Sequence, residues 1–438
     1  MKELEKHFFE FKKNIIGELD TQRKNLYGKE ILYADWAASG RMYKPIEERI
    51  IEQYGPYYSN LHSEGNYISD VMSEEYEKSK KSIKKHFGAS DDYFVLARGY
   101  GMTAVSVHLV EMFKNQGFEP DETVVIMSEY EHNSNFLVWK KMKFIIEILK
   151  NEENGQINLN DLEERLKRNC RKKIIVTISA CSNVTGVLID IRRVSEIVKK
   201  YNAILILDYT ACAPYSFINL SKLNVDVLLF SVHKFIGGVS GPGIMIAKLE
   251  LFKKEKPTYY GGGIVEWVNP WGDESYLSNI EQREEVGTVG IMQMIRARLC
   301  IDLKESMGKK QIIQREKELR ANLINGMNKL DITLYDNRIE ERLPIVSFNF
   351  NNCNYLEGVH MLNKKFGIQA RGGCCCASIY GHEILNISKK DSEREIERLR
   401  RNKEKNSEYG WIRISLAPIV LDEEVNYIIN AIDDISRG

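Results

Sequence analysis

Apolar and polar positions alternate along this chain between short runs typical of buried strands and longer stretches with helical spacing. Apolar runs predict strands at residues 93–97, 123–127, 173–178, 204–208 and 225–231. Helical spacing lies between these runs, at residues 103–115, 135–142, 159–168 and 192–201. Strands that alternate with helices predict crossover connections and an α/β fold with a mainly parallel sheet.

The two ends of the chain predict further elements around this sheet. An amphipathic helix is expected at residues 3–27, and a long helical connection at 291–330. A second lobe follows, with strands at 343–350 and 411–416, a helix at 356–366 and a terminal helix from Leu421. We therefore expect three segments: an N-terminal helical segment (1–30) packed on the small domain, a large domain (31–305), and a small α+β domain (306–438).

Composition excludes several classes of protein. Of 438 residues, Lys plus Arg and Asp plus Glu number 62 each, so no net charge favours binding to nucleic acid or to an anionic membrane. The apolar runs fall short of the roughly 20 residues that a membrane helix needs. The N-terminus is charged and lacks the apolar core of a signal peptide, so we expect a cytoplasmic protein. The very charged run at 389–406 predicts a solvated helix or a mobile insertion, with a partner surface as the alternative.

Asp208 and Lys234 are the most informative pair of residues. Asp208 ends the apolar run 203–208, and Lys234 lies in Ser231-Val-His-Lys-Phe-Ile-Gly-Gly238, ahead of a glycine-rich turn. A lysine in such a turn can form a Schiff base with the aldehyde of pyridoxal phosphate. A carboxylate at a strand end can keep the pyridine nitrogen protonated, which makes the ring an electron sink. Each residue alone has an ordinary explanation, but together they favour a pyridoxal phosphate site.

The segment Ser231-Val-His-Lys234 resembles the cofactor-lysine motif of the class V aminotransferases, particularly the branch of cysteine desulfurases and selenocysteine lyases. The resemblance extends from about residue 31 to about residue 432. It implies the pyridoxal phosphate-dependent transferase fold type I and a homodimer with shared active sites. Thr288, in Gly287-Thr288, is similar to the family's residue that reaches the phosphate of the neighbouring subunit.

A cradle for the cofactor phosphate is expected where a strand runs through two glycines into a helix, at residues 96–105. Glycines let backbone N–H groups approach a phosphate, and a helix N-terminus favours an anion. A plain tight turn is the alternative, but the turn is similar to the family's Gly-x-Gly-x-Thr. The resemblance assigns phosphate contacts to Gly101, Met102, Thr103, Ser231 and His233.

The cofactor ring is expected to contact two polar residues that follow strands. His132, in Ser128-Glu-Tyr-Glu-His-Asn-Ser-Asn135, resembles the family's ring-stacking histidine, which also moves protons. Asn183 matches the family's asparagine that hydrogen-bonds the phenolic oxygen. The chain departs from the family at Ala211, where a glutamine is frequent, so one hydrogen bond near that oxygen is missing or comes from elsewhere.

The second lobe carries the residues that decide the substrate and the reaction. Arg413, in an apolar strand, aligns with the family's arginine for the substrate α-carboxylate, and its guanidinium suits bidentate pairing. Gln369-Ala-Arg-Gly-Gly-Cys-Cys-Cys-Ala377 resembles the desulfurase segment Arg-x-Gly-x-x-Cys-Ala. That register makes Cys376 the acceptor thiol and Arg371 the accompanying arginine, while Cys374 and Cys375 leave the identity of the working thiol open. No cysteine pair has the C-x-x-C spacing of a zinc site, so no metal is expected.

These residues predict a cysteine desulfurase-like enzyme that cleaves the C–S bond of L-cysteine to give alanine and a cysteine persulfide, which passes to an acceptor such as a protein. Selenocysteine lyase, another pyridoxal phosphate lyase or epimerase, and an aminotransferase acting on a different amino acid are the alternatives. They are favoured if Cys376 points away from the cofactor. A non-catalytic scaffold that binds partners is the second alternative.

Overall fold

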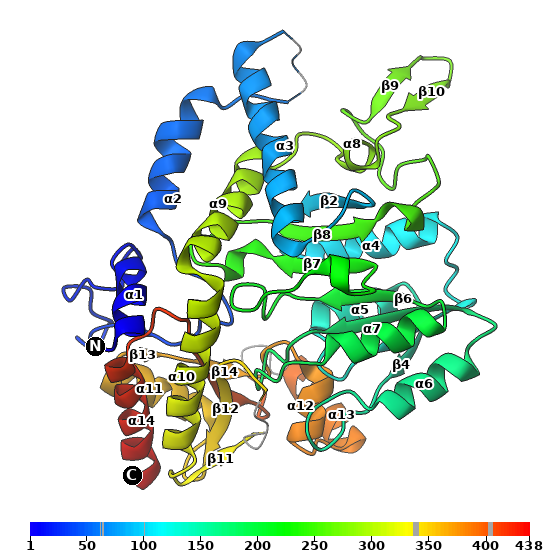
Figure 1. The fold of residues 1–438 in the computed structure, drawn as a ribbon. Helices are drawn as coiled ribbons and strands as arrows, with labels where there is room; N and C mark the ends of the chain where they lie inside the picture. Colours follow the sequence, from blue (N-terminus) through cyan, green and yellow to red (C-terminus); the bar gives the residue numbers. More distant parts are fainter. Residues whose placement is uncertain (62, 64, 100, 336–340, 402–405) are drawn as a thin grey trace.

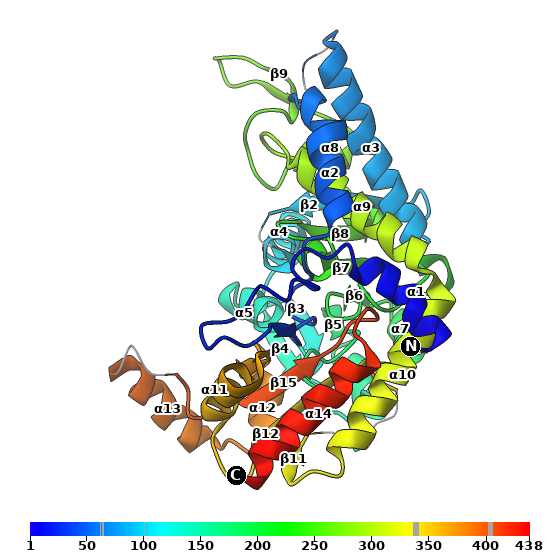
Figure 2. The same cartoon turned by 90° about the vertical axis from the view of Figure 1, so that its left-hand side faces the viewer.

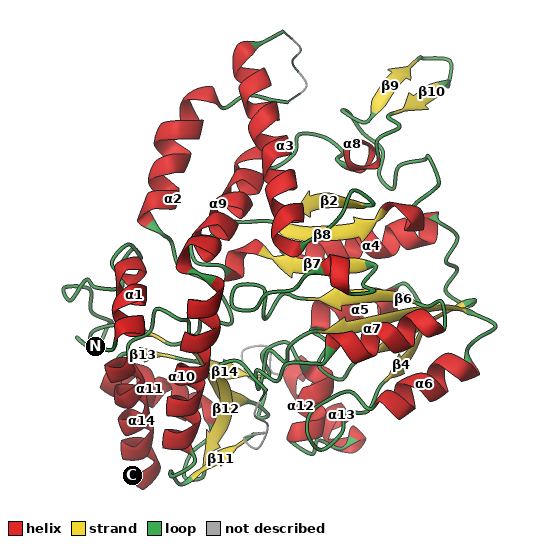
Figure 3. Ribbon diagram, in the orientation of Figure 1, coloured by secondary structure: helices red, strands yellow, loops and turns green. Residues whose placement is uncertain are grey.

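The computed structural model describes residues 1–438 except 62, 64, 100, 336–340 and 402–405 (Figure 1). A large sheet of seven strands lies beside a smaller sheet of four strands. Helices cover both sheets, as the colouring by secondary structure shows (Figure 3). No helix in the described ranges is long and apolar enough to cross a membrane.

The large sheet is mostly parallel, as the sequence predicts. Its strand order is β2 (Tyr93–Arg98), β8 (Gly243–Lys248), β7 (Val227–Ser231), β6 (Ile204–Asp208), β5 (Lys173–Ser179), β3 (Thr123–Met127) and β4 (Ile145–Ile148). The strands from β7 to β4 pair in parallel, whereas β8 is antiparallel to both of its neighbours. The predicted strands of this sheet are confirmed to within a few residues. The sequence patterns missed two strands of this sheet, the short edge strand β4 and β8, whose apolar run directly follows a glycine-rich turn.

Helices bury both faces of this sheet, which explains why its strands are apolar on both sides. One face packs against α4 (Met102–Asn115) and α5 (Asn133–Lys141). The other face packs against α3 (Tyr67–Phe87), α6 (Leu159–Arg168), α7 (Ile191–Lys200) and α9 (Ile291–Met307). Because both faces are covered, only the ends of the strands and the loops that follow them can form a site for a ligand.

The smaller sheet is antiparallel, in the order β11 (Ile332–Leu334), β12 (Ile345–Phe350), β15 (Trp411–Ser415) and β14 (Arg371–Gly373). Around it lie α10 (Lys309–Met327), α11 (Tyr355–Phe366) and α14 (Asp422–Arg437), as Figure 2 shows. Two helices follow the cysteine run, α12 (Ser378–Ile384) and α13 (Lys389–Arg401). The charged run at 389–406 is thus largely the solvated helix α13, and residues 402–405 of it lie outside the described residues.

Several short elements complete the chain. β1 (Leu32–Tyr33) pairs in parallel with β13 (Ile368–Gln369), and the hairpin of β9 (Val265–Val268) and β10 (Glu274–Tyr276) projects from the body beside α8 (Ile280–Glu284) (Figure 1). The helix α2 (Lys44–Glu48) continues into a π-helix at Arg49–Tyr54. Short 3₁₀ helices lie at Gly55–Tyr57, Leu220–Lys222, Val232–Lys234 and Leu249–Leu251.

The expected N-terminal helix at residues 3–27 is wrong in length, because α1 spans Glu3–Lys12. The chain then turns: Ile15 forms a bridge with Tyr43, and Gly17 adopts a left-handed φ of 87°. The apolar face of the expected helix is buried only in part, with Phe8 1% and Ile15 3% exposed but Leu19 46% exposed. Tertiary pairing, rather than helix continuation, therefore buries Ile15, and Leu19 lies outside the core.

The expected helical connection at 291–330 is two helices. Gly308, with a φ of 84°, separates α9 from α10, because a left-handed residue cannot continue a helix. The N-terminal segment touches the terminal helix through ion pairs from Lys2 to Asp422 (2.9 Å) and from Lys12 to Glu424 (2.9 Å). The division into segments 1–30, 31–305 and 306–438 stays a prediction.

Candidate active site

A cavity lies at the carboxyl ends of the parallel strands, where ligands bind in open α/β sheets. Its wall gathers side chains from the loops after β2, β3, β5, β6 and β7. The described residues that line it are Met102, Thr103, Tyr130, His132, Ser134, Ser179, Cys181, Asn183, Asp208, Thr210, Ala211, Ser231, His233 and Lys234. Most of the residues that the sequence analysis assigned to the cofactor therefore lie around one cavity.

Lys234 and Asp208 lie in the wall of this cavity at the ends of neighbouring parallel strands, β7 and β6. Burial and the nearby cation of Arg413 lower the pKa of the Lys234 amine to about 8. Burial raises the pKa of the Asp208 carboxyl, although the backbone N–H of Thr210 donates a hydrogen bond to Oδ1 at 2.9 Å. A partly neutral amine beside a carboxylate suits both attack on an aldehyde and stabilisation of a cationic ring.

The glycine turn after β2 and the turn after β7 form one cradle. The backbone N–H of Met102 donates to Ser231 Oγ at 2.7 Å, which joins the two turns at the N-terminus of α4. Gly101 has a φ of 62°, and a Cβ placed there would lie 2.9 Å from Cε1 of His233 and 3.0 Å from Ser231 Oγ. The absence of a side chain at Gly101 therefore lets the turn approach Ser231 and His233 closely, and it brings a helix N-terminus, a hydroxyl and an imidazole together, a set of groups that fits a phosphate.

His132 is the N-cap residue of α5 and is partly exposed in the cavity wall. Its Nδ1 accepts a hydrogen bond from the backbone N–H of Ser134 at 3.2 Å and lies 2.6 Å from Ser134 Oγ. Burial and the charge of Lys234 lower the pKa of His132 to about 4, so the ring is neutral near pH 7. Because Nδ1 is an acceptor, the ring proton of this neutral histidine is on Nε2.

One polar atom in the cavity wall has no protein partner within the described part of the chain. Asn183 Oδ1 is buried and makes no hydrogen bond to the described residues. Such an atom is costly unless a ligand or water satisfies it. Together with the cradle at Gly101, this atom makes the cavity fit a polar, phosphate-bearing cofactor. Ala211 lines the wall where the family frequently has glutamine, so that departure lies inside the cavity.

Glu131 was not predicted, and it lies beneath the cavity at 0% exposure. It accepts hydrogen bonds from Ser128 Oγ (2.6 Å), the backbone N–H of Ser179 (2.6 Å) and Asn135 Nδ2 (2.5 Å). Burial and the charge of Asp208 raise the pKa of Glu131 to about 8. Through these hydrogen bonds the Glu131 carboxyl connects the end of β3 with the end of β5. The sequence offered one sign of this role, namely that Glu131 directly precedes His132.

Arg413 lies in the middle of β15 and is 1% exposed. Its Nη1 donates to the backbone carbonyl of Asn183 at 2.8 Å, and its Nη2 donates to Asp35 Oδ1 at 2.6 Å. Arg371 is its cross-strand partner in β14, and both cations lower the pKa of Lys234. The predicted pair of arginines therefore lies next to the cavity, although neither is part of the wall described above.

The three adjacent cysteines point to different surroundings. Cys374 Sγ lies 3.4 Å from the carbonyl oxygen of Tyr409, Cys375 is 5% exposed, and Cys376 is exposed to solvent. Burial raises the pKa of the Cys374 thiol to about 11 and also raises that of Cys375, which Arg413 and Arg371 partly offset. None of the three is among the described residues that line the cavity. The structure thus brings Cys376 to the surface near the site and not into it.

Thr288 is exposed in the loop between α8 and α9, and it does not belong to the described lining of the cavity of its own chain. The described residues contain no group of three or more His, Cys, Asp or Glu side chains that could hold a metal ion.

Comparisons with known proteins agree with this geometry. The family model of the class-V aminotransferases matches residues 32–428. A probable cysteine desulfurase of Pyrococcus abyssi is 27% identical over 354 residues, covering 80% of this chain and 86% of that protein. One from Halalkalibacterium halodurans is 25% identical over 356 residues, covering 80% and 85%.

Solved structures share the whole architecture. A cysteine desulfurase of Thermococcus onnurineus in its apo form has a TM-score of 0.81 at 24% identity and covers 98% of each chain. The Escherichia coli cysteine desulfurase CsdA has a TM-score of 0.77 at 20% identity and covers 97% of each chain. The large parallel sheet with its smaller α+β partner is therefore the pyridoxal phosphate-dependent transferase fold of type I. The chain belongs to the class-V aminotransferase family, and it is an enzyme of the pyridoxal phosphate-dependent kind.

Proposed function

We propose that this enzyme is a cysteine desulfurase that converts L-cysteine to alanine and leaves the sulfur as a persulfide on Cys376. The observation that carries the proposal is that Asp208, at the end of β6, and Lys234, just after β7, line one cavity beside the buried cation of Arg413. The names of the related proteins support the same substrate.

Pyridoxal phosphate would be held by the residues that border the cavity. Gly101, Met102, Thr103, Ser231 and His233 would bind its phosphate, and Asp208 would hold its ring nitrogen. When bound, the cofactor supplies an electron sink for the substrate α-carbon. Lys234 would bind the aldehyde, and Asn183 and His132 would contact the ring from the wall.

The chain's own groups then handle the protons and the substrate. The lowered pKa of Lys234 leaves a sizeable fraction of its amine neutral near pH 8, so Lys234 can remove the α-proton. His132, with its proton on Nε2, can donate that proton toward the cavity. Arg413 would bind the α-carboxylate, because it is a buried guanidinium whose Nε has no partner within the described residues.

The sulfur transfer needs a thiolate. A Cys376 thiolate would attack the substrate sulfur and form an S–S bond while the C–S bond breaks. Its electron pair stays with the carbon, which takes up a proton and leaves as alanine. Cys376 and Cys375 have left-handed φ values of 58° and 49°, a conformation that is strained for residues other than glycine. We infer that the loop rearranges to bring Cys376 to the substrate.

A twofold homodimer is part of the proposal. The loop that carries Gly287 is tied to the base of the β9–β10 hairpin, because the Gly287 N–H donates to the Gly262 carbonyl at 2.9 Å. This hairpin exposes Trp267 (71%) and Trp271 (86%), an apolar surface that a second copy would cover. Thr288 would then reach the partner's phosphate. A protein that accepts the sulfur, and a cytoplasmic location, stay predictions.

A second candidate function is another pyridoxal phosphate reaction on an amino acid, such as that of a selenocysteine lyase, an epimerase or an aminotransferase. The exposure of Cys376, outside the described lining of the cavity, favours it. Family membership gives no support to a non-catalytic scaffold.

An assay of the holoenzyme with L-cysteine distinguishes these functions. We expect alanine and, in the presence of a reductant, sulfide in equal amounts. Pyruvate from L-cysteine, or turnover of another amino acid without alanine from L-cysteine, would contradict the proposed desulfurase.

A further inference from the structure

Asp35 is the charged partner of Arg413 within this chain. The two residues form an ion pair of 2.6 Å, in which the side chain of Asp35 is 18% exposed and that of Arg413 is buried. Arg413 Nη1 is bound to the Asn183 carbonyl, and Nε is buried without a partner in the described ranges. A guanidinium carries more N–H donors than these two contacts use. A ligand carboxylate can therefore bind Arg413 while Asp35 stays in place.

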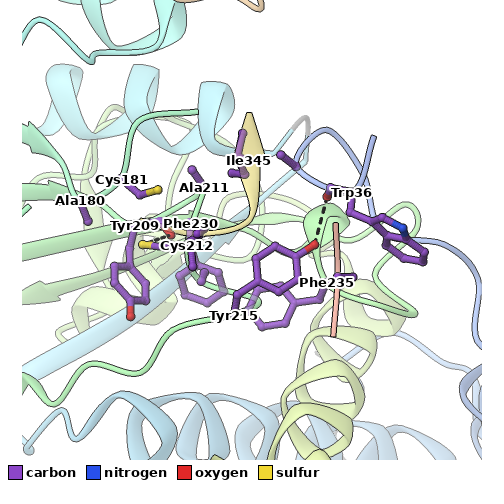
Figure 4. Packing of buried hydrophobic residues seen from close by; sticks show 14 of the residues in the cluster. Trp36, Ala180, Cys181, Tyr209, Ala211, Cys212, Tyr215, Phe230, Phe235 and Ile345 are labelled. Carbon is purple, nitrogen blue, oxygen red and sulfur yellow. Dashed lines mark hydrogen bonds between the residues drawn. The ribbon is translucent and has the colours of Figure 1, made fainter. Parts of the chain in front are cut away.

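The position of Asp35 is fixed by its neighbours in the chain. Trp36 is fully buried, its backbone N–H donates to the Ser415 carbonyl at 3.4 Å, and its own carbonyl accepts from the Tyr215 hydroxyl at 3.2 Å (Figure 4). Ala37 N–H donates to Ser415 Oγ at 2.9 Å. Ser415 lies two positions after Arg413 in β15, so the same strand end holds both members of the ion pair.

A carboxylate fixed in this way has two opposite effects on a site for an anion. It compensates the buried charge of Arg413 when no ligand is bound, because an unpaired buried cation is costly. It also repels the carboxylate of an incoming ligand, because two like charges must then share one guanidinium. Since the hydrogen bonds of Trp36 and Ala37 anchor the backbone beside Asp35, we expect its carboxylate to stay close to Arg413 when a ligand binds.

We propose that Asp35 is an internal counter-ion that limits the affinity of the site for the α-carboxylate of its amino acid ligands. This inference rests on the proposed role of Arg413 in binding that carboxylate. Asp35 keeps Arg413 neutralised and in place between turnovers, and it weakens the binding of substrate and product alike.

The test replaces Asp35 by asparagine, which keeps an oxygen that can accept from Arg413 and removes the charge. The dissociation constants of L-alanine, L-cysteine and cysteamine are measured from the visible absorption of the holoenzyme. Cysteamine has the amine and the thiol of cysteine without the carboxylate. In Asp35→Asn we expect at least about five-fold tighter binding of both amino acids and a lower KM for L-cysteine without a higher kcat, while cysteamine changes by less than about two-fold.

Asp433→Asn is the matched control, because Asp433 forms an exposed ion pair of 2.7 Å with Arg437 on α14, far along the chain from Asp35. It should leave all three dissociation constants unchanged. Asp35→Ser is tested in parallel and should shift them in the same direction as Asp35→Asn, so that the result does not depend on the folding of one variant.

Unchanged or weaker binding of L-alanine in the folded Asp35 variants overturns the inference, as does an equal shift for cysteamine. Tighter binding of L-alanine in variants of an enzyme that never releases alanine from L-cysteine would support the counter-ion and reject the proposed desulfurase. Production of alanine from L-cysteine together with unchanged dissociation constants in the Asp35 variants would support the proposed desulfurase and reject the counter-ion.

Discussion

The side-chain amide of Asn183 donates a hydrogen bond to the backbone carbonyl of Cys375 at 2.8 Å. This contact joins the wall of the cofactor cavity to the cysteine loop of the smaller sheet, across 192 residues of sequence. The backbone carbonyl of Cys376 is held in a similar way, by the N–H of Asn133 at 2.8 Å. The loop is therefore fastened to the cavity by its backbone, while its thiols point elsewhere.

The first prediction concerns these thiols. Cys376→Ser should lose nearly all production of alanine from L-cysteine while it keeps the cofactor spectrum, because it removes the exposed thiol. Cys374→Ser and Cys375→Ser should lose less, since burial raises the pKa of both thiols and leaves them protonated near pH 7. Mass spectrometry after a pulse of cysteine should find the first persulfide on Cys376. Wild-type alanine production by Cys376→Ser would reject the desulfurase mechanism.

The second prediction identifies the cofactor lysine. The purified protein should be yellow, and borohydride reduction should fix the cofactor covalently on Lys234, as peptide mapping would show. Lys234→Ala should abolish turnover even if it still binds the cofactor noncovalently. Recovery of the label on another lysine, such as the buried Lys304, would make the assignment wrong.

The third prediction concerns pH. Burial disfavours the charged ammonium and lowers the pKa of Lys234 to about 8, and the neutral amine is the form that reacts with an aldehyde. The rate at which apoenzyme takes up pyridoxal phosphate should therefore rise about tenfold per pH unit below pH 8 and level off above it. Stopped-flow absorbance measures this rate. A rate that keeps rising up to pH 10.5, the ordinary pKa of a lysine side chain, would contradict the lowered pKa.

The fourth prediction compares two glycines of one turn. In Gly101→Ala the new Cβ would meet His233 and Ser231 at about 3 Å and would force a left-handed φ on alanine, which costs about 1–3 kcal/mol. Affinity for pyridoxal phosphate should fall at least about tenfold, and affinity for pyridoxal, which lacks the phosphate, should fall less. Gly99→Ala is the control, because a Cβ there meets no described atom within 4 Å. Equal losses in the two variants would contradict the cradle.

The fifth prediction concerns assembly. The active form should be a twofold dimer in which the β9–β10 hairpin and the Thr288 loop are covered by the partner. Replacing Trp267 and Trp271, which are 71% and 86% exposed, by serine should shift the sedimentation of the protein toward the monomer and lower its activity in parallel. A fully active monomer at the assay concentration would reject the shared site.

The sequence by itself determined the alternation of strands and helices, because apolar periodicity reflects which face of an element is buried. It also determined the order of the site motifs. Asp208 ends a strand, Lys234, His132 and the Gly101 turn each follow one, and strand ends meet at one edge of a parallel sheet. The tertiary structure decided those features that depend on contacts between distant parts of the chain. It ended α1 at Lys12 through the pairing of Ile15 with Tyr43, and it inserted the antiparallel β8.

It also decided the contacts between segments far apart in the chain. Asp35 meets Arg413 across 378 residues, and the Cys375 carbonyl meets Asn183. No local periodicity encodes such a pair, because it arises where the smaller sheet packs beside the large one. The direction in which each of three identical neighbouring thiols points depends on the same packing. The sequence could therefore predict the cysteine loop but not which of its thiols is exposed.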